Sequence, residues 1–96
     1  MPDEFIKKLS SIIKERKDQL PENSYVAKLF KSGKVKIANK LGEEATETVS
    51  AFLSQTNKEI LEESADLIFH LMVLLEHKGL TLEEVFDVLE SRMNND

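Results

Sequence analysis

Two pairs of carboxylates, each with a spacing of three residues, are the groups in this chain best placed to do chemistry. The pairs are Glu44 with Glu47, and Glu63 with Asp66. Residues 41–77 contain eight Asp or Glu and one Lys, whereas the rest of the chain contains ten acids and twelve bases. Like charges three or four residues apart destabilise a helix by roughly 0.2–0.5 kcal/mol per pair. A bound divalent cation would relieve this repulsion, so the segment predicts a metal site.

Helical geometry predicts that these carboxylates converge. At about 100° per residue, Glu63, Asp66 and His70 share one stripe of a helix, and Glu44 and Glu47 share a flank of the preceding helix. If the two helices pack antiparallel, as a short connection implies, the four carboxylates face one another. Oxygen ligands without cysteine favour Mg²⁺, with Mn²⁺ as a substitute, over zinc. A solvated acidic face is the alternative, and His70 is either a hydrogen-bonded core residue or a ligand.

A lysine-rich stretch directly upstream predicts a binding surface for phosphates. It holds five lysines in thirteen residues: Lys28, Lys31, Lys34, Lys36 and Lys40. Mg²⁺ is commonly held by carboxylates together with substrate phosphates, so the combination indicates a polyphosphate small molecule and metal-assisted hydrolysis of a phosphoanhydride. A solvated face is again the alternative. The net charge of −5 and the lack of aromatic residues among the lysines argue against nucleic acid.

Apolar residues recur at helical spacing along the chain, without a period-2 strand pattern. We expect a first helix over about residues 3–18, which Pro21 stops, a second over about 24–31, which Ser24 caps, and a third over about 35–54. A fourth helix should run from the capping box Thr56-x-x-Glu59 to Gly79, and a fifth should begin at the capping box Thr81-x-x-Glu84. The third should carry its apolar side chains inward, Val49, Phe52 and Leu53 among them. The expected fold is all-α: a four-to-five-helix bundle forming a single domain over residues 1–96.

The fourth helix is apolar on nearly every face between Leu67 and Leu75. A helix that is apolar all round must be covered all round, and a chain of 96 residues has few helices to cover it. We therefore expect a homodimer with a two-fold axis. No cysteine, secretory signal pattern or membrane-length apolar run is present, so we expect a soluble, cytoplasmic protein without a membrane partner.

The sequence around both carboxylate pairs resembles the phosphoribosyl-ATP pyrophosphohydrolase family, within the wider all-α, MazG-like nucleotide pyrophosphohydrolases. The resemblance covers essentially the whole chain and rests on Ser24-Tyr25, Lys28-Leu29-Phe30, Lys40-Leu41-Gly42-Glu43-Glu44-Ala45-Thr46-Glu47 and Glu63-Ser64-Ala65-Asp66-Leu67-Ile68-Phe69-His70-Leu71. The E-x-x-E and E-x-x-D pattern is common to the superfamily, whereas the runs from Gly42 to Ala45 and from Asp66 to His70 are specific. Val26, Ser64 and Phe69 depart from the usual threonine, alanine and tyrosine.

This resemblance implies the second step of histidine biosynthesis, the Mg²⁺-dependent hydrolysis of phosphoribosyl-ATP to phosphoribosyl-AMP and pyrophosphate, in a dimer. It also implies roles for individual residues: metal ligands and catalytic acids at Glu44, Glu47, Glu63 and Asp66; a catalytic role for Glu43, which either orients water or supports the metal ligands without binding the ion; and substrate binding by Lys28, Lys36, Lys40 and His70. The cyclohydrolase domain to which some relatives are fused is not expected here. Two alternatives stay open: a house-cleaning nucleoside triphosphate pyrophosphohydrolase, and a non-catalytic helical interaction module.

Overall fold

Five helices and no strand make up the described part of the chain in the computed structural model, which covers the backbone of residues 2–94 and the side chains of residues 4–94. The helices are α1 (Pro2–Gln19), α2 (Tyr25–Ser32), α3 (Lys34–Ser54), α4 (Asn57–His77) and α5 (Leu82–Met93). The predicted all-α class is confirmed. None of these helices combines the length and the apolarity needed to cross a membrane. The predicted domain also includes residues 1, 95 and 96, which lie outside the described residues.

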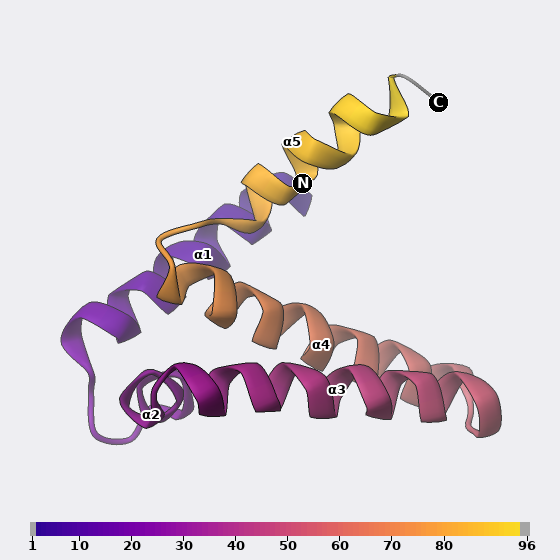
Figure 1. Ribbon diagram of the computed structural model, residues 1–96, viewed down its shortest axis with the longest axis horizontal. Helices are drawn as coiled ribbons and strands as arrows, with labels where there is room; N and C mark the ends of the chain where they lie inside the picture. Colours follow the sequence, from indigo (N-terminus) through magenta and orange to yellow (C-terminus); the bar gives the residue numbers. More distant parts are fainter. Residues whose placement is uncertain (1, 95–96) are drawn as a thin grey trace.

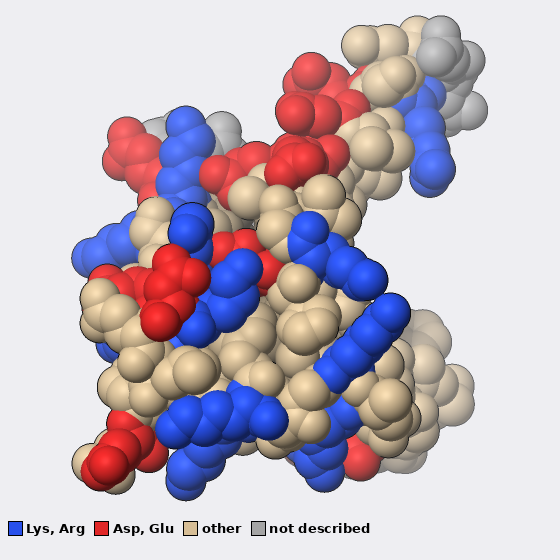
Figure 2. Space-filling view, turned by 60° about the vertical axis from the view of Figure 1, so that its left-hand side comes forward, with Lys and Arg blue, Asp and Glu red and all other residues tan. Residues whose placement is uncertain are grey.

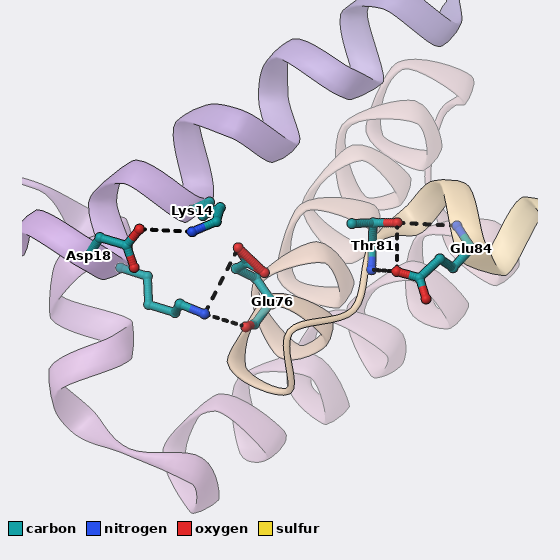
Figure 3. A network of polar contacts seen from close by, with 6 residues as sticks. Lys14, Asp18, Glu76, Thr81 and Glu84 are labelled. Carbon is teal, nitrogen blue, oxygen red and sulfur yellow. Dashed lines mark hydrogen bonds and ion pairs between the residues drawn. The ribbon is translucent and has the colours of Figure 1, made fainter.

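Three helices begin at the hydroxyl caps that the sequence predicts. The Ser24 hydroxyl accepts a hydrogen bond from the Ala27 N–H at 3.1 Å and so begins α2. Thr56 and Thr81 begin α4 and α5, each in a capping box with the glutamate three residues later. Figure 3 shows the reciprocal contacts of Thr81 with Glu84. These caps pair amide groups that the first turn of a helix leaves unpaired.

Proline and glycine end α1 and α4. Leu20, the residue before Pro21, has φ of +49°, so the chain leaves helical geometry where the proline disfavours it. After α4, Gly79 has φ of +74°. The Gly79 N–H donates to the Glu76 carbonyl and the Leu80 N–H to the Leu75 carbonyl, each at 2.9 Å. This is a Schellman motif, and glycine adopts its left-handed conformation without steric cost.

The long helices α3 and α4 form an antiparallel hairpin that is the frame of the molecule (Figure 1). Each has 21 residues, and the two lie side by side. α2 lies across the end of the hairpin where α3 begins, and it contacts both α3 and α4. α1 contacts α2 and α4, and α5 contacts α1. The middle of α3 therefore faces the middle of α4, as convergence of the predicted carboxylates requires.

The core lies in the half of the hairpin on which the other helices pack. Its buried apolar side chains come from all five helices: Ile13, Leu29, Ile37, Met72, Val73 and Leu82. The prediction that Val49, Phe52 and Leu53 point inward is wrong for the single chain, since Phe52 and Leu53 are 72 % and 73 % exposed. Figure 1 shows that α1, α2 and α5 lie away from the hairpin tip, so no other helix of the described chain covers these side chains.

Candidate metal and substrate site

The carboxylates of α3 and α4 meet where the two helices face each other. One carboxylate oxygen from each of Glu44, Glu63 and Asp66 lies within 4.8 Å of the other two. Glu44 is only 7 % exposed, Glu63 is half-buried and Asp66 is exposed, so the group sits at the edge of the helix–helix contact. The Glu47 carboxyl lies within hydrogen-bonding reach of both Glu44 and Glu63. The structure thus brings together all four acids; we call these four residues the carboxylate cluster.

Two oxygens of the carboxylate cluster lack a hydrogen-bond partner. The Oε2 atoms of Glu44 and Glu63 are buried, and no described residue donates to them. Burial, followed by the neighbouring Glu47 carboxyl, raises the pKa of Glu44 above its usual value. The neighbouring Glu47 carboxyl, followed by burial, raises the pKa of Glu63 above its usual value. The negative charge of the cluster is therefore unfavourable in this environment, and a proton or a cation would stabilise it.

Lys40, directly before the acidic segment of residues 41–77, lies beside the carboxylate cluster. Its Nζ is 3.4 Å from Glu43 Oε2 and 3.9 Å from Glu44 Oε1. The Tyr25 phenol is the main cause that raises the pKa of Lys40, and the two glutamates add to it against the opposing effect of burial. One ammonium cannot neutralise four carboxylates. Glu43 itself is exposed and pairs with Lys40 rather than joining the three oxygens that lie closest together.

Two other acids of the acidic segment have structural partners. Glu76 is buried where α4 meets α1, and its Oε1 lies 3.9 Å from Lys17 Nζ. Glu59 accepts a hydrogen bond from the Thr56 hydroxyl at 2.8 Å in the capping box. Of the eight acids in the segment, two therefore have roles in the fold and four converge.

His70 is a buried link between the carboxylate cluster and α2. Its Nδ1 is 2.7 Å from the Asp66 carbonyl oxygen, and its Nε2 is 2.9 Å from the Tyr25 hydroxyl oxygen. A carbonyl oxygen only accepts, so Nδ1 carries a proton; in the neutral ring Nε2 then accepts the hydrogen bond that the Tyr25 hydroxyl donates. Both ring nitrogens are thus engaged within the protein. Any contribution of His70 to substrate binding therefore passes through Tyr25 or Asp66.

Thr48 is part of the site, although the sequence pattern did not single it out. Its Oγ1 is 2.8 Å from the Glu44 carbonyl oxygen on α3 and 3.1 Å from the Glu63 carbonyl oxygen on α4. The hydroxyl therefore joins the two backbones at the level of the carboxylate cluster. A threonine that bonds the carbonyl four residues earlier is ordinary in helices. The sequence offered no signal for the second bond, because that bond depends on how α3 and α4 pack.

The other two predicted substrate-binding lysines lie on the surface at one end of the hairpin. Lys28 is on α2 and Lys36 is near the start of α3, and both are exposed. Lys36, Lys40 and Glu44 follow at intervals of four residues, so they share one stripe of α3 over about 12 Å of helix. Figure 2 shows Lys and Arg side chains across the lower part of this face, where α2 and the start of α3 lie in Figure 1.

The donors of the carboxylate cluster fit a hard divalent cation. Oxygens bound to octahedral Mg²⁺ at 2.0–2.1 Å are roughly 2.9 Å apart when adjacent and roughly 4.1 Å apart when opposite, so the three oxygens within 4.8 Å of one another would share an ion once their side chains draw closer together. The two buried oxygens without partners offer lone pairs to such an ion. The chain has no cysteine, and both nitrogens of His70 are engaged, which disfavours softer metals.

Comparison with known proteins connects this site to one enzyme family. The sequence profile of a family described as phosphoribosyl-ATP pyrophosphohydrolase matches residues 6–93. The phosphoribosyl-ATP pyrophosphatase of Metallosphaera sedula is 48 % identical over 90 residues, which cover 94 % of this chain and 97 % of that protein. The protein of the same name from Zymomonas mobilis is 49 % identical over 92 residues, which cover 96 % and 86 %.

A longer relative matches with part of its length. The histidine biosynthesis bifunctional protein HisIE of Xanthomonas campestris is 46 % identical over 91 residues, which make up 95 % of this chain and 44 % of that protein. The profile match spans both helices that carry the carboxylate cluster. The chain therefore belongs to the phosphoribosyl-ATP pyrophosphohydrolase family.

Proposed function

We propose that this chain hydrolyses phosphoribosyl-ATP to phosphoribosyl-AMP and pyrophosphate, the second step of histidine biosynthesis. Water adds at the α–β phosphoanhydride, the bridging P–O bond breaks, and the leaving pyrophosphate takes the bond electrons. The observation that carries this proposal is the convergence of four carboxylates from two facing helices, two of them with buried, unpaired oxygens. The names of the two relatives of similar length supply the substrate.

We assign Mg²⁺, with Mn²⁺ as a substitute, to the carboxylate cluster. When bound, the ion neutralises phosphate charge and polarises a phosphoryl oxygen. The protein holds the ligands in place: the Thr48 hydroxyl bonds the backbones of Glu44 and Glu63, and the His70 ring bonds the backbone of Asp66. Ligands supported in this way need little reorganisation on metal binding.

The charged side chains around the carboxylate cluster take the remaining roles in this proposal. Lys40, whose ammonium lies beside Glu44, binds substrate phosphate, and Lys28 and Lys36 extend the positive surface towards α2. Glu43 is exposed next to Lys40, outside the closest group of ligand oxygens. A carboxylate in that position is free to orient the attacking water, which is the role we assign to it.

Lysine substitutions test the phosphate assignment. Lys28→Ala and Lys40→Ala should raise KM alone if the contact is equally strong with substrate and transition state. They should also lower kcat if the contact strengthens as charge develops on the leaving pyrophosphate. Lys8→Ala on α1, which removes an exposed lysine, is the matched control. Unaltered kinetics in both test variants would remove these lysines from the site.

A substrate panel separates the proposed reaction from its alternatives. Turnover of phosphoribosyl-ATP, but not of canonical or damaged deoxynucleoside triphosphates, supports the proposal. Turnover of the deoxynucleoside triphosphates instead supports a house-cleaning pyrophosphohydrolase. A non-catalytic interaction module would hydrolyse neither, and its thermal stability would not respond to Mg²⁺.

We further propose that the enzyme is a homodimer. The chain exposes 6875 Å², whereas a compact monomer of its mass exposes roughly 5,600 Å². Its radius of gyration is 14.5 Å, against about 12.5 Å for a compact domain of this length. The excess area exceeds the roughly 800 Å² that each partner buries in a standard interface. Large exposed apolar side chains on α3 and α4 mark the surface to be covered: Val49, Phe52, Leu53, Leu61 and Ile68.

A further inference from the structure

Tyr25 presents an aromatic face that the proposed hydrolysis does not yet use. The residue is 49 % exposed, although its hydroxyl is bonded to the buried His70. The ring stacks on Phe69, with centroids 6.2 Å apart and planes 25° apart. His70 packs in a T-shaped arrangement with Tyr25, with centroids 5.8 Å apart and planes 80° apart. The ring is therefore fixed by Phe69 and at its hydroxyl, while much of its surface remains in solvent.

Phe69 and His70, which contact the Tyr25 ring, also contact each other. Phe69 and His70 are neighbours on α4, and their rings meet at 89° with centroids 5.1 Å apart. Phe69 offers Tyr25 a purely apolar stacking surface. A ring held by such contacts loses little conformational freedom when a ligand stacks on it. Rigid aromatic side chains are effective binding surfaces for this reason.

The Tyr25 ring also lies next to the groups assigned to phosphate and metal. One imidazole ring separates its hydroxyl from the backbone of Asp66. Lys40, the lysine assigned to phosphate, has its Nζ 3.9 Å from Glu44 Oε1, and Glu44 lies together with Asp66, whose backbone His70 links to Tyr25. In a nucleotide, the base and the first phosphate are one ribose apart. The hydrogen bonds from the Tyr25 hydroxyl to His70 and from His70 to the Asp66 backbone place the ring beside the carboxylate cluster, as a ligand with both of these parts requires.

We propose that the adenine base of the substrate stacks on the exposed face of Tyr25, which makes this residue a determinant of nucleotide specificity. The inference rests on the proposed function and adds a base-binding surface to it. Stacking of a base on an aromatic side chain changes affinity by a factor of roughly 5 to 150. Because every base has a π-face, the contact selects nucleotides over phosphates that carry no base, without reading the edge of the base.

The chain carries its own reporter for this contact. Tyr25 is the single tyrosine and there is no tryptophan, so intrinsic fluorescence reports this ring alone. With Mg²⁺ present, AMP should quench the emission saturably, after correction for AMP absorbance with free N-acetyltyrosinamide. Pyrophosphate and ribose 5-phosphate, which carry no base, should quench little. Equal quenching by all three compounds, or none by AMP at concentrations that inhibit hydrolysis, would overturn the inference.

Variants separate stacking from a structural role of Tyr25. Tyr25→Leu should weaken inhibition by AMP roughly 5- to 150-fold and leave inhibition by pyrophosphate unchanged. Tyr25→Phe keeps the ring and should show a smaller effect. Phe5→Leu, which removes an exposed aromatic ring on α1, is the matched control, and thermal unfolding shows that each variant is folded. Equal weakening of AMP and pyrophosphate in Tyr25→Leu would assign the residue a structural role and overturn the proposal.

The outcomes for base stacking and for the proposed reaction are separable. Saturable quenching by AMP in a protein that fails to hydrolyse phosphoribosyl-ATP would support the base site and refute the reaction. Hydrolysis without quenching would refute the base site and leave the reaction standing.

Discussion

Replacing Glu47 by glutamine should give a protein that is more stable without metal and inactive with it. The Glu47 carboxyl lies within hydrogen-bonding reach of Glu44 and Glu63, whose Oε2 atoms are buried and unpaired. A glutamine of the same shape offers two N–H donors, whereas the ionised glutamate offers only acceptors. The substitution therefore supplies a missing donor and removes one repelling charge, and it also removes one charge from the proposed metal ligands.

The size of the stabilisation follows from the burial of Glu44. A hydrogen bond to a charged group contributes about 1.5–3 kcal/mol. The Glu47 side chain is exposed, so we count only the bond to Glu44 and reduce it to about 1 kcal/mol for solvent screening. For a domain of this size, 1 kcal/mol corresponds to a rise in Tm of roughly 4–8 °C. Mg²⁺ at 100 times its Kd would stabilise the wild type by about 2.7 kcal/mol, and Glu47→Gln should lose most of this.

Thermal unfolding in EDTA and in Mg²⁺, at one protein concentration, measures both changes in stability, and pyrophosphate release measures activity. Glu62→Gln is the matched control, because it makes the same charge change at an exposed position of α4 outside the carboxylate cluster. Near-normal activity of Glu47→Gln at saturating Mg²⁺ would remove Glu47 from the metal ligands. A Tm in EDTA below that of the wild type would refute the reasoning from repulsion and unpaired oxygens.

The free energy of unfolding of the metal-free wild type should fall, relative to that of Glu44→Gln, as the pH rises. The fall begins at about pH 4.3, the ordinary pKa of glutamate, and continues through the raised pKa of Glu44 and the raised pKa of Glu63. In this pH range the folded state retains protons that the unfolded chain releases. Denaturant titrations of both proteins across the range measure the two free energies of unfolding, and a difference between them that does not change with pH would contradict the prediction. Thr48→Val should lower the free energy of unfolding by about 1 kcal/mol and weaken Mg²⁺ binding, whereas Thr46→Val, whose hydroxyl bonds only its own helix, should change neither. Equal unfolding curves would contradict this. Phe52→Glu should convert a dimer of twice 11.0 kDa into a folded monomer in light scattering, and a wild-type mass near 11.0 kDa would refute the dimer.

The helices were predictable because local signals determine their ends. Ser24 and Thr56 cap helices with their own side chains, and Gly79 ends α4 through its own backbone conformation. Such signals act within a few residues. The surroundings of Phe52 could not be predicted in this way, because periodicity identifies an apolar face but not whether a helix lies opposite it.

The carboxylate cluster was predictable for a related reason. A three-residue spacing places two acids on one helix face, and the short connection between α3 and α4 makes the helices neighbours. The supporting contacts were not predictable: Tyr25 and His70 are 45 residues apart in sequence, and Thr48 and Glu63 are 15 apart. Those bonds depend on how the helices pack, which no local pattern records.

Pyrophosphate release from phosphoribosyl-ATP, measured first in EDTA and then after Mg²⁺ is restored, tests the central claim most directly. We expect one pyrophosphate and one phosphoribosyl-AMP per substrate, at a rate that is negligible in EDTA and rises to saturation with Mg²⁺. An equal rate in EDTA, or release of orthophosphate in place of pyrophosphate, would contradict hydrolysis of the α–β phosphoanhydride at a metal held by the carboxylate cluster.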